Sequence, residues 1–149
     1  MKLCRIGELG KEKPAIIDKD GSYKDLSGTI SDLDPKTLNF ETFEKLSKLN
    51  IKDLPTIDKN SRIGACVKNP SKFLGIGLNF KDHATEQNLP IPKEPIIFSK
   101  FTNCIVGPND NIEVPKNSNH TDWEVEIGFV VGKKAKSVSY THLRAHETR

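Results

Sequence analysis

The stretch Asn119-His-Thr-Asp-Trp-Glu-Val-Glu-Ile-Gly-Phe-Val-Val-Gly132 decides which fold this sequence can form. Residues 123–131 are rich in aromatic and β-branched side chains between turn formers, which predicts a β-strand. Side chains alternate between the faces of a strand, so Glu124 and Glu126 point the same way, about 7 Å apart. Two carboxylates this close repel each other, unless a divalent cation binds both of them or water solvates them. The apolar run at residues 128–131 favours a strand deep in a sheet, and therefore the cation.

Composition excludes several classes of protein. The chain has 149 residues, enough for one domain, with 35% hydrophobic residues and a net charge of +3. Lysines are scattered among acidic residues without a basic run, so no nucleic-acid partner is expected. No apolar stretch reaches transmembrane length and residues 1–7 lack the core of a signal peptide, so we expect a cytoplasmic protein without a membrane partner. The odd number and wide spacing of the cysteines predict buried free thiols at Cys4, Cys66 and Cys104.

The first 65 residues predict a small β-rich lobe. Short strands are expected at residues 3–6, 15–17 and 22–26, separated by glycine-containing and polar turns. A helix capped by Asn39 follows, because apolar side chains recur there at helical spacing: Phe40, Phe43, Leu46 and Leu49. A polar connector with two prolines places the boundary of the lobe between residues 55 and 70.

The second half alternates short elements with turns. We expect strands at residues 72–78, 96–101 and 112–115, a tight turn at 107–110, and a short helix at 79–87 capped by Asn79. The glycine pattern of the first of these strands lacks the third glycine of a dinucleotide-binding fingerprint, so no such cofactor is expected.

Three side chains of this half could take part in chemistry. His83 and Glu86 share one helical face, and a carboxylate beside an imidazole suits a general base, although exposed pairs at this spacing are common without a function. Lys100, at the end of a strand, could meet an anionic substrate or simply reach solvent.

Four motifs then stand in a specific order. They are Gly77-Leu-Asn-Phe-Lys-Asp-His-Ala-Thr-Glu86, Glu94-Pro-Ile-Ile-Phe-Ser-Lys100, Gly107-Pro-Asn-Asp110 and Asp122-Trp-Glu-Val-Glu126. This series resembles the fumarylacetoacetate hydrolase family, and the resemblance covers residues 1–137. It implies an α+β, mainly β fold: a β/α lobe at residues 1–65, like the N-terminal extension of bacterial members, and at residues 70–137 the first, incomplete part of a mixed β-sheet roll.

The resemblance also implies roles for individual residues. Glu124 and Glu126 match the family's metal ligands, which hold Mg²⁺ or alternatively Mn²⁺ or Ca²⁺. His83 and Glu86 match a catalytic dyad on a helix that orders over bound substrate, and Lys100 matches a catalytic lysine. Phe80 replaces the commoner tyrosine. The implied activity is metal-dependent hydrolysis or lysis of C–C bonds in a small 2,4-dioxo acid, first of all a 2,4-diketo-3-deoxy-sugar acid, by a protein that is a homodimer when full length.

Other functions stay open beside this one. An oxo-acid decarboxylase or isomerase, or a ureidoglycolate lyase, would use the same fold, and a non-catalytic binding or scaffold protein could have kept it. A zinc module using His142 and His146, one helical turn apart, is a further alternative.

The last residues depart from the family. The resemblance ends at residue 137, and residues 138–149 look like a translated sequencing adapter rather than a family segment. The third carboxylate of the family's metal site has no counterpart. We therefore expect a truncated chain that folds poorly, binds Mg²⁺ weakly and is inactive by itself.

Overall fold

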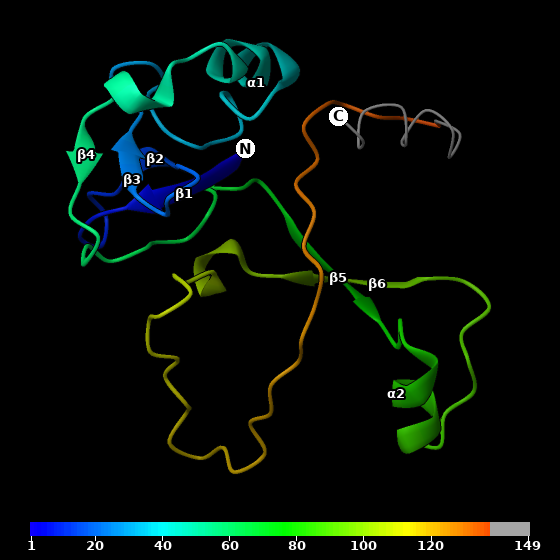
Figure 1. Cartoon of the computed structure of the whole chain (residues 1–149). Coiled ribbons are helices and arrows are strands. Elements are labelled where there is room, and N and C mark those ends of the chain that lie inside the picture. Colours follow the sequence, from blue (N-terminus) through cyan, green and yellow to red (C-terminus); the bar gives the residue numbers. More distant parts are fainter. Residues whose placement is uncertain (138–149) are drawn as a thin grey trace.

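The computed structural model describes residues 1–137 and shows an α+β fold made mainly of strands (Figure 1). Its first sheet has four antiparallel strands in the order β1-β2-β3-β4. These strands are β1 (Lys2–Ile6), β2 (Lys13–Ile17), β3 (Tyr23–Asp25) and β4 (Thr56–Ile57). The first three confirm the predicted strands of the lobe. The strand β4 was not predicted, because two residues are too few to show a period.

The helix α1 (Phe40–Ser47) covers this sheet and begins as predicted. The side chain of Asn39 accepts a hydrogen bond from the backbone N–H of Thr42 at 2.9 Å, which satisfies one of the free donors of the first turn. Leu46 is buried, whereas Phe40 is 47% exposed, so the apolar stripe is narrower than its spacing predicted. A short 3₁₀ turn, η1 (Ile51–Asp53), leads from the helix towards β4.

The buried core of the described residues lies mostly in this lobe. One cluster joins the sheet to α1 and the preceding loop, and its buried members are Ile16, Leu26, Ile30, Leu33 and Leu46. A second cluster contains Cys4, Ile6 and Ala15. Cys4 is buried as predicted, but Cys66 and Cys104 are exposed. The prediction of buried thiols was wrong for these two because they lie outside the core-forming elements.

The second sheet is an antiparallel pair, β5 (Phe73–Gly77) and β6 (Ile96–Lys100), which confirms two more predicted strands. The helix α2 (Lys81–Glu86) follows β5, and the 3₁₀ turn η2 (Thr102–Cys104) follows β6 (Figure 1). The predicted cap of α2 was wrong: Phe80 occupies the N-cap position and makes no side-chain cap bond. Leu78 has a φ of 47°, a left-handed conformation that turns the chain sharply between β5 and α2.

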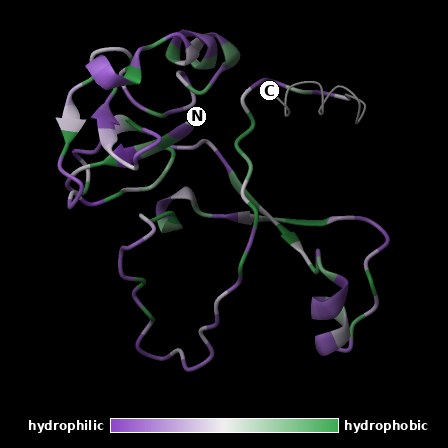
Figure 2. Ribbon diagram, viewed as in Figure 1, coloured by the Kyte–Doolittle hydropathy of each residue, from purple (hydrophilic) through white to green (hydrophobic). Residues whose placement is uncertain are grey.

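The chain from residue 111 to 137 is exposed and forms no helix or strand. The strands predicted at residues 112–115 and 123–131 are therefore wrong for the described structure. A strand requires a partner for its backbone hydrogen bonds, and neither the four-stranded sheet nor the β5–β6 pair offers one to these residues. Figure 2 shows hydrophobic residues along this extended segment and along β5 and β6. Among the described helices, none combines the length and hydrophobicity needed to cross a bilayer.

Candidate active site

The helix α2 carries the predicted catalytic pair. His83 is half-buried and Glu86 is exposed, while Ala84 is the buried residue of the helix. The helix ends at Glu86, and two residues later Asn88 has a φ of 54°, which lets the N–H of Leu89 bond to the carbonyl of Ala84 at 2.9 Å. The two candidate side chains therefore lie on a short helix that is closed at its C-terminal end by backbone geometry.

The polar partner of His83 differs from the one that the sequence suggested. Its Nε2 lies 2.6 Å from Nε2 of Gln87, one helical turn further on. An amide nitrogen can only donate, so with the amide of Gln87 oriented this way Nε2 of His83 is the acceptor. Within residues 1–137 no hydrogen bond joins His83 to Glu86. Gln87 is thus a residue that sequence reasoning missed, although its i, i+4 spacing from His83 could have revealed it.

Lys100 lies at the opposite end of the β5–β6 ladder from α2. The register pairs Lys100 with Phe73, whereas Gly77, just before α2, pairs with Ile96. Strands rise about 3.4 Å per residue, so roughly 14 Å of ladder lies between these two ends. The described structure therefore brings His83 and Glu86 onto one helix but does not bring Lys100 to them (Figure 1).

Glu124 and Glu126 lie on the extended, exposed segment without a strand. Their carboxylates are the oxygen ligands that Mg²⁺ or Ca²⁺ prefers. Among the described residues, however, no group of three histidine, cysteine, aspartate or glutamate side chains lies close enough to hold a metal ion. The donor chemistry suits a divalent cation, but the set of ligands does not form a complete metal site.

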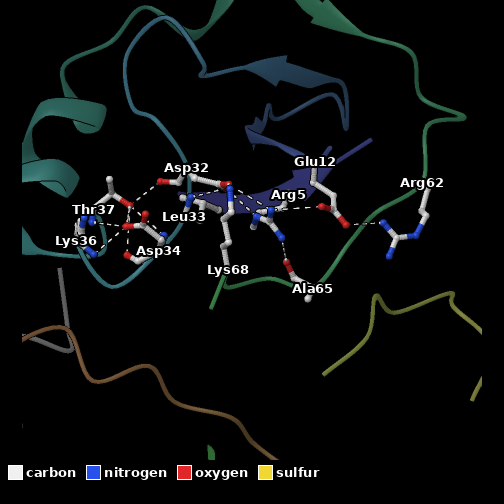
Figure 3. Close-up of polar contacts among 10 residues, drawn as sticks. All are labelled: Arg5, Glu12, Asp32, Leu33, Asp34, Lys36, Thr37, Arg62, Ala65 and Lys68. Carbon is white, nitrogen blue, oxygen red and sulfur yellow. Dashed lines mark hydrogen bonds and ion pairs between the residues drawn. The ribbon is translucent and has the colours of Figure 1, made fainter. Parts of the chain in front are cut away.

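A chain of ion pairs joins the third motif, residues 107–110, to the N-terminal lobe. Figure 3 shows the part of this chain that runs from Arg62 through Glu12 and Arg5 to Asp32. Arg62 bonds to Asp110 and, through its Nη1, to Oε1 of Glu12 at 2.7 Å. Glu12 pairs with Arg5 at 3.4 Å, and Nε of Arg5 donates to Oδ1 of Asp32 at 2.7 Å. Lys68 also pairs with Asp32, at 3.0 Å. Acidic and basic side chains thus alternate from the third motif into the N-terminal lobe.

Burial and ion pairing together change the pKa of two acidic side chains in this chain of ion pairs. Arg5 and Asp32 are 5% and 4% exposed. Burial alone would raise the pKa of the Asp32 carboxyl, but hydrogen bonds from Arg5 and Lys68 outweigh it and hold the pKa below its usual value. Burial and the hydrogen bond from Arg62 oppose each other at Glu12 in the same way, and the net effect again lowers the pKa. Both groups therefore stay ionised and paired.

The segment that carries Glu124 and Glu126 returns to the lobe at its end. Val130 and Gly132 line a cavity of about 190 Å³ together with residues of the lobe and connector: Leu3, Leu33, Leu38, Phe43, Cys66 and Val67. The cavity is apolar and offers no cluster of polar groups that would orient a substrate. We interpret it as incomplete packing between the lobe and residues 130–132.

Comparison with known proteins defines the class. The sequence profile described as "Fumarylacetoacetate (FAA) hydrolase C-terminal" matches residues 72–147, just over half of the 149 residues. The chain belongs to the fumarylacetoacetate hydrolase family, whose members are typically hydrolases or lyases. The match extends into residues 138–147, which lie outside the described residues. The adapter origin of the tail and the zinc role of His142 and His146 concern that same segment, and they stay predictions.

Relatives and a solved structure agree with this membership. Proteins named "Putative hydrolase" from Burkholderia lata and from Burkholderia ambifaria are each 49% identical over 138 residues, which is 93% of this chain. The chain spans about half the length of these curated relatives, 49% in both cases. A crystal structure of a "putative HpcE protein" from Mycobacterium smegmatis has a TM-score of 0.57 at 23% identity, covering 75% of this chain and 40% of that one. It supports the fold.

Proposed function

We propose that this chain carries the general base of an enzyme that hydrolyses C–C bonds in 2,4-dioxo acids, with 2,4-diketo-3-deoxy-sugar acids as the first substrate class. The observation that supports it is the position of His83 on α2. Its Nε2 lies 2.6 Å from the amide nitrogen of the exposed Gln87, in a side chain that is only half-buried. A general base requires an imidazole nitrogen with a free lone pair, so the exposed side chain of Gln87 must release Nε2 before this nitrogen takes a proton from water.

The proposed reaction follows from this base. Nε2 of His83 takes a proton from water, and the hydroxide attacks a carbonyl carbon of the substrate. The C–C bond then breaks, and its electron pair remains on the leaving carbon as an enolate. The imidazolium of His83 gives its proton to this enolate. We assign to Glu86, three residues further along the same helix, the stabilisation of the imidazolium by its charge. The reaction consumes one water, and no oxidant or reductant is needed.

We assign to Lys100 the binding of a substrate carboxylate. The roughly 14 Å of ladder between Lys100 and α2 is longer than a small oxo acid. Joint action with His83 therefore requires α2 to close over the β5–β6 pair, as a lid does. We also propose that the whole protein, a homodimer, binds Mg²⁺ with Glu124 and Glu126 among its ligands and further donors from outside residues 1–137. The 149-residue chain by itself is expected to bind Mg²⁺ weakly and to be inactive.

The test measures cleavage of an acylpyruvate by the protein expressed from its complete genomic reading frame, with and without added Mg²⁺. His83→Asn should lower kcat by about 10²–10⁴-fold, the usual contribution of a general base. His120→Asn is the matched control, because this exposed histidine lies on residues 111–122, outside α2. Equal activity of both variants would overturn the role of His83.

Product analysis separates the alternatives on the same fold. Release of two carboxylic or oxo-acid fragments supports hydrolysis, whereas carbon dioxide or a rearranged acid points to a decarboxylase or isomerase. Glyoxylate and urea from ureidoglycolate would identify a lyase of that type. A complete protein that binds these acids and turns over none of them would be a scaffold, and the proposal would fail.

A further inference from the structure

Lys100 ends β6 on a face of the β5–β6 pair that carries two aromatic rings. Its Nζ lies 5.7 Å from the ring centroid of Phe73 and 5.9 Å from that of Phe98. Both distances are within the range in which an ammonium is attracted to the face of an aromatic ring. Lys100 is therefore held by two rings at once, rather than extending freely into solvent.

Strand register explains how the three side chains meet. Phe73 lies directly opposite Lys100 in the antiparallel ladder, so their side chains leave the same face of the pair. Phe98 precedes Lys100 by two residues on β6 and shares that face because side chains alternate along a strand. Phe101, the next residue, lies just beyond the end of β6 and is 85% exposed.

Gly75 is the fourth part of the arrangement. It pairs with Phe98 across the ladder, and a Cβ at this position would lie 2.5 Å from Cζ of the Phe98 ring. The ring of Phe98 thus occupies the space that any other residue at position 75 would fill. The glycine lets the ring lie across β5, where it reaches under the ammonium of Lys100.

We propose that Phe73 and Phe98 are positioning residues that fix the ammonium of Lys100 on one face of the β5–β6 pair, and that Gly75 admits the ring of Phe98. The proposal rests on the proposed function only for what Lys100 does there, which is to meet a substrate carboxylate. An ammonium between two rings is kept from pairing with carboxylates of the protein, yet it stays exposed to an anion from solvent. Among the described residues no ion pair engages Lys100.

The experiment measures how fast Lys100 of the 149-residue chain reacts with an acylating reagent, by isotope-labelled competition and mass spectrometry. The exposed Lys93 of the same chain is the internal standard. An ammonium must leave the rings before it reacts, so Phe98→Leu and Phe73→Leu should each raise the relative rate of Lys100 about two- to fivefold, as expected for an exposed cation–π contact. Phe101→Leu is the matched control and should leave the rate unchanged.

Two further variants and one spectrum keep the test decisive. Phe98→Tyr retains the ring and should restore the wild-type rate, whereas Gly75→Ala removes neither partner and should still raise it. In wild-type protein, the ε-methylene protons of Lys100 should resonate upfield of those of the other lysines because of the ring currents, and Phe98→Leu should abolish this shift.

Wild-type Lys100 that reacts and resonates like Lys93, or a Phe101→Leu effect as large as that of Phe98→Leu, would overturn the proposal. Neither readout depends on turnover, so failure of the proposed function would leave the result standing.

Discussion

Arg62 and Asp110 lie 48 residues apart and form a two-bond ion pair, from Nε to Oδ1 at 2.7 Å and from Nη2 to Oδ2 at 2.5 Å. The same Oδ2 accepts the backbone N–H of Gly107 at 2.7 Å. One carboxylate therefore closes the turn at residues 107–110 and attaches it to the connector of the N-terminal lobe. The hydrogen bond from Arg62, followed by that from Gly107, lowers the pKa of Asp110 below its usual value, so this link stays charged.

Replacing Asp110 should release the turn. Asp110→Ala removes both acceptors of Arg62 and the acceptor of the Gly107 amide, so that amide should exchange with solvent roughly tenfold faster or more. Hydrogen exchange followed by NMR measures this. Asn109→Ala, an exposed neighbour in the same turn, is the control and should leave the rate unchanged. A protected Gly107 amide in Asp110→Ala would mean that the turn is held by other contacts.

Adding one methyl group at Gly107 should destabilise the same contact. A Cβ at Gly107 would collide with the backbone oxygen of Ile63 and lie 3.1 Å from Cα of Gly64, and backbone atoms cannot move aside cheaply. Gly107→Ala should therefore lower the free energy of unfolding by about 1–3 kcal/mol in urea titrations. Gly128→Ala is the matched control, because nothing lies within 4 Å of its Cβ position. Equal stability of the two variants would refute the close approach.

The buried pair Arg5–Asp32 should matter more than the exposed pairs. Asp32→Ala leaves the guanidinium of Arg5 buried without its main partner, and we expect a loss of about 3–5 kcal/mol in the free energy of unfolding. Glu8→Ala removes one partner of the exposed Lys11–Glu8 pair and should change stability by less than about 0.5 kcal/mol. Chemical denaturation followed by circular dichroism compares them. A small effect at Asp32 would show that Arg5 finds another acceptor or solvent.

Acid should weaken the lobe through Asp32 and Glu12. Both groups have a lower pKa in the folded protein than their ordinary values of about 3.9 and 4.3, so the unfolded state binds more protons between the two pKa values. Their contribution is complete above about pH 5 and is lost as the pH falls through the folded pKa values, below about 4. Thermal melts across this range should show falling stability. In Asp32→Ala the fall should be shallower, and a parallel fall would contradict the assignment.

The tautomer of His83 offers a separate check. Since Nε2 accepts from Gln87, the neutral ring should carry its proton on Nδ1, which ¹⁵N chemical shifts of the imidazole report. Gln87→Ala should shift the ring towards the tautomer that is commoner in free histidine. Glu86→Gln should leave the wild-type tautomer in place, because no hydrogen bond links the two residues within the described part of the chain. The opposite pattern would restore Glu86 as the orienting partner.

Local pattern was sufficient for much of the fold. The strands β1, β2, β5 and β6 and the helix α1 follow from alternation, helical spacing and the Asn39 cap, which are properties of neighbouring residues. The four-motif series was likewise enough to predict the family, because the order of short motifs is read directly from the chain. These features can be predicted from the sequence because each depends on interactions within a few residues.

The tertiary structure alone decided the relations between distant residues. Residues 123–131 have the composition of a strand, but pairing needs a neighbouring ladder, and the described residues do not supply it. The link from Arg62 to Asp110 and the placement of Lys100 over Phe73 depend on which segments meet. Sequence by itself determined which side chains could act, through their chemistry and local spacing. Chain packing determined which of them meet, because contact across long separations depends on the whole fold and not on neighbouring residues.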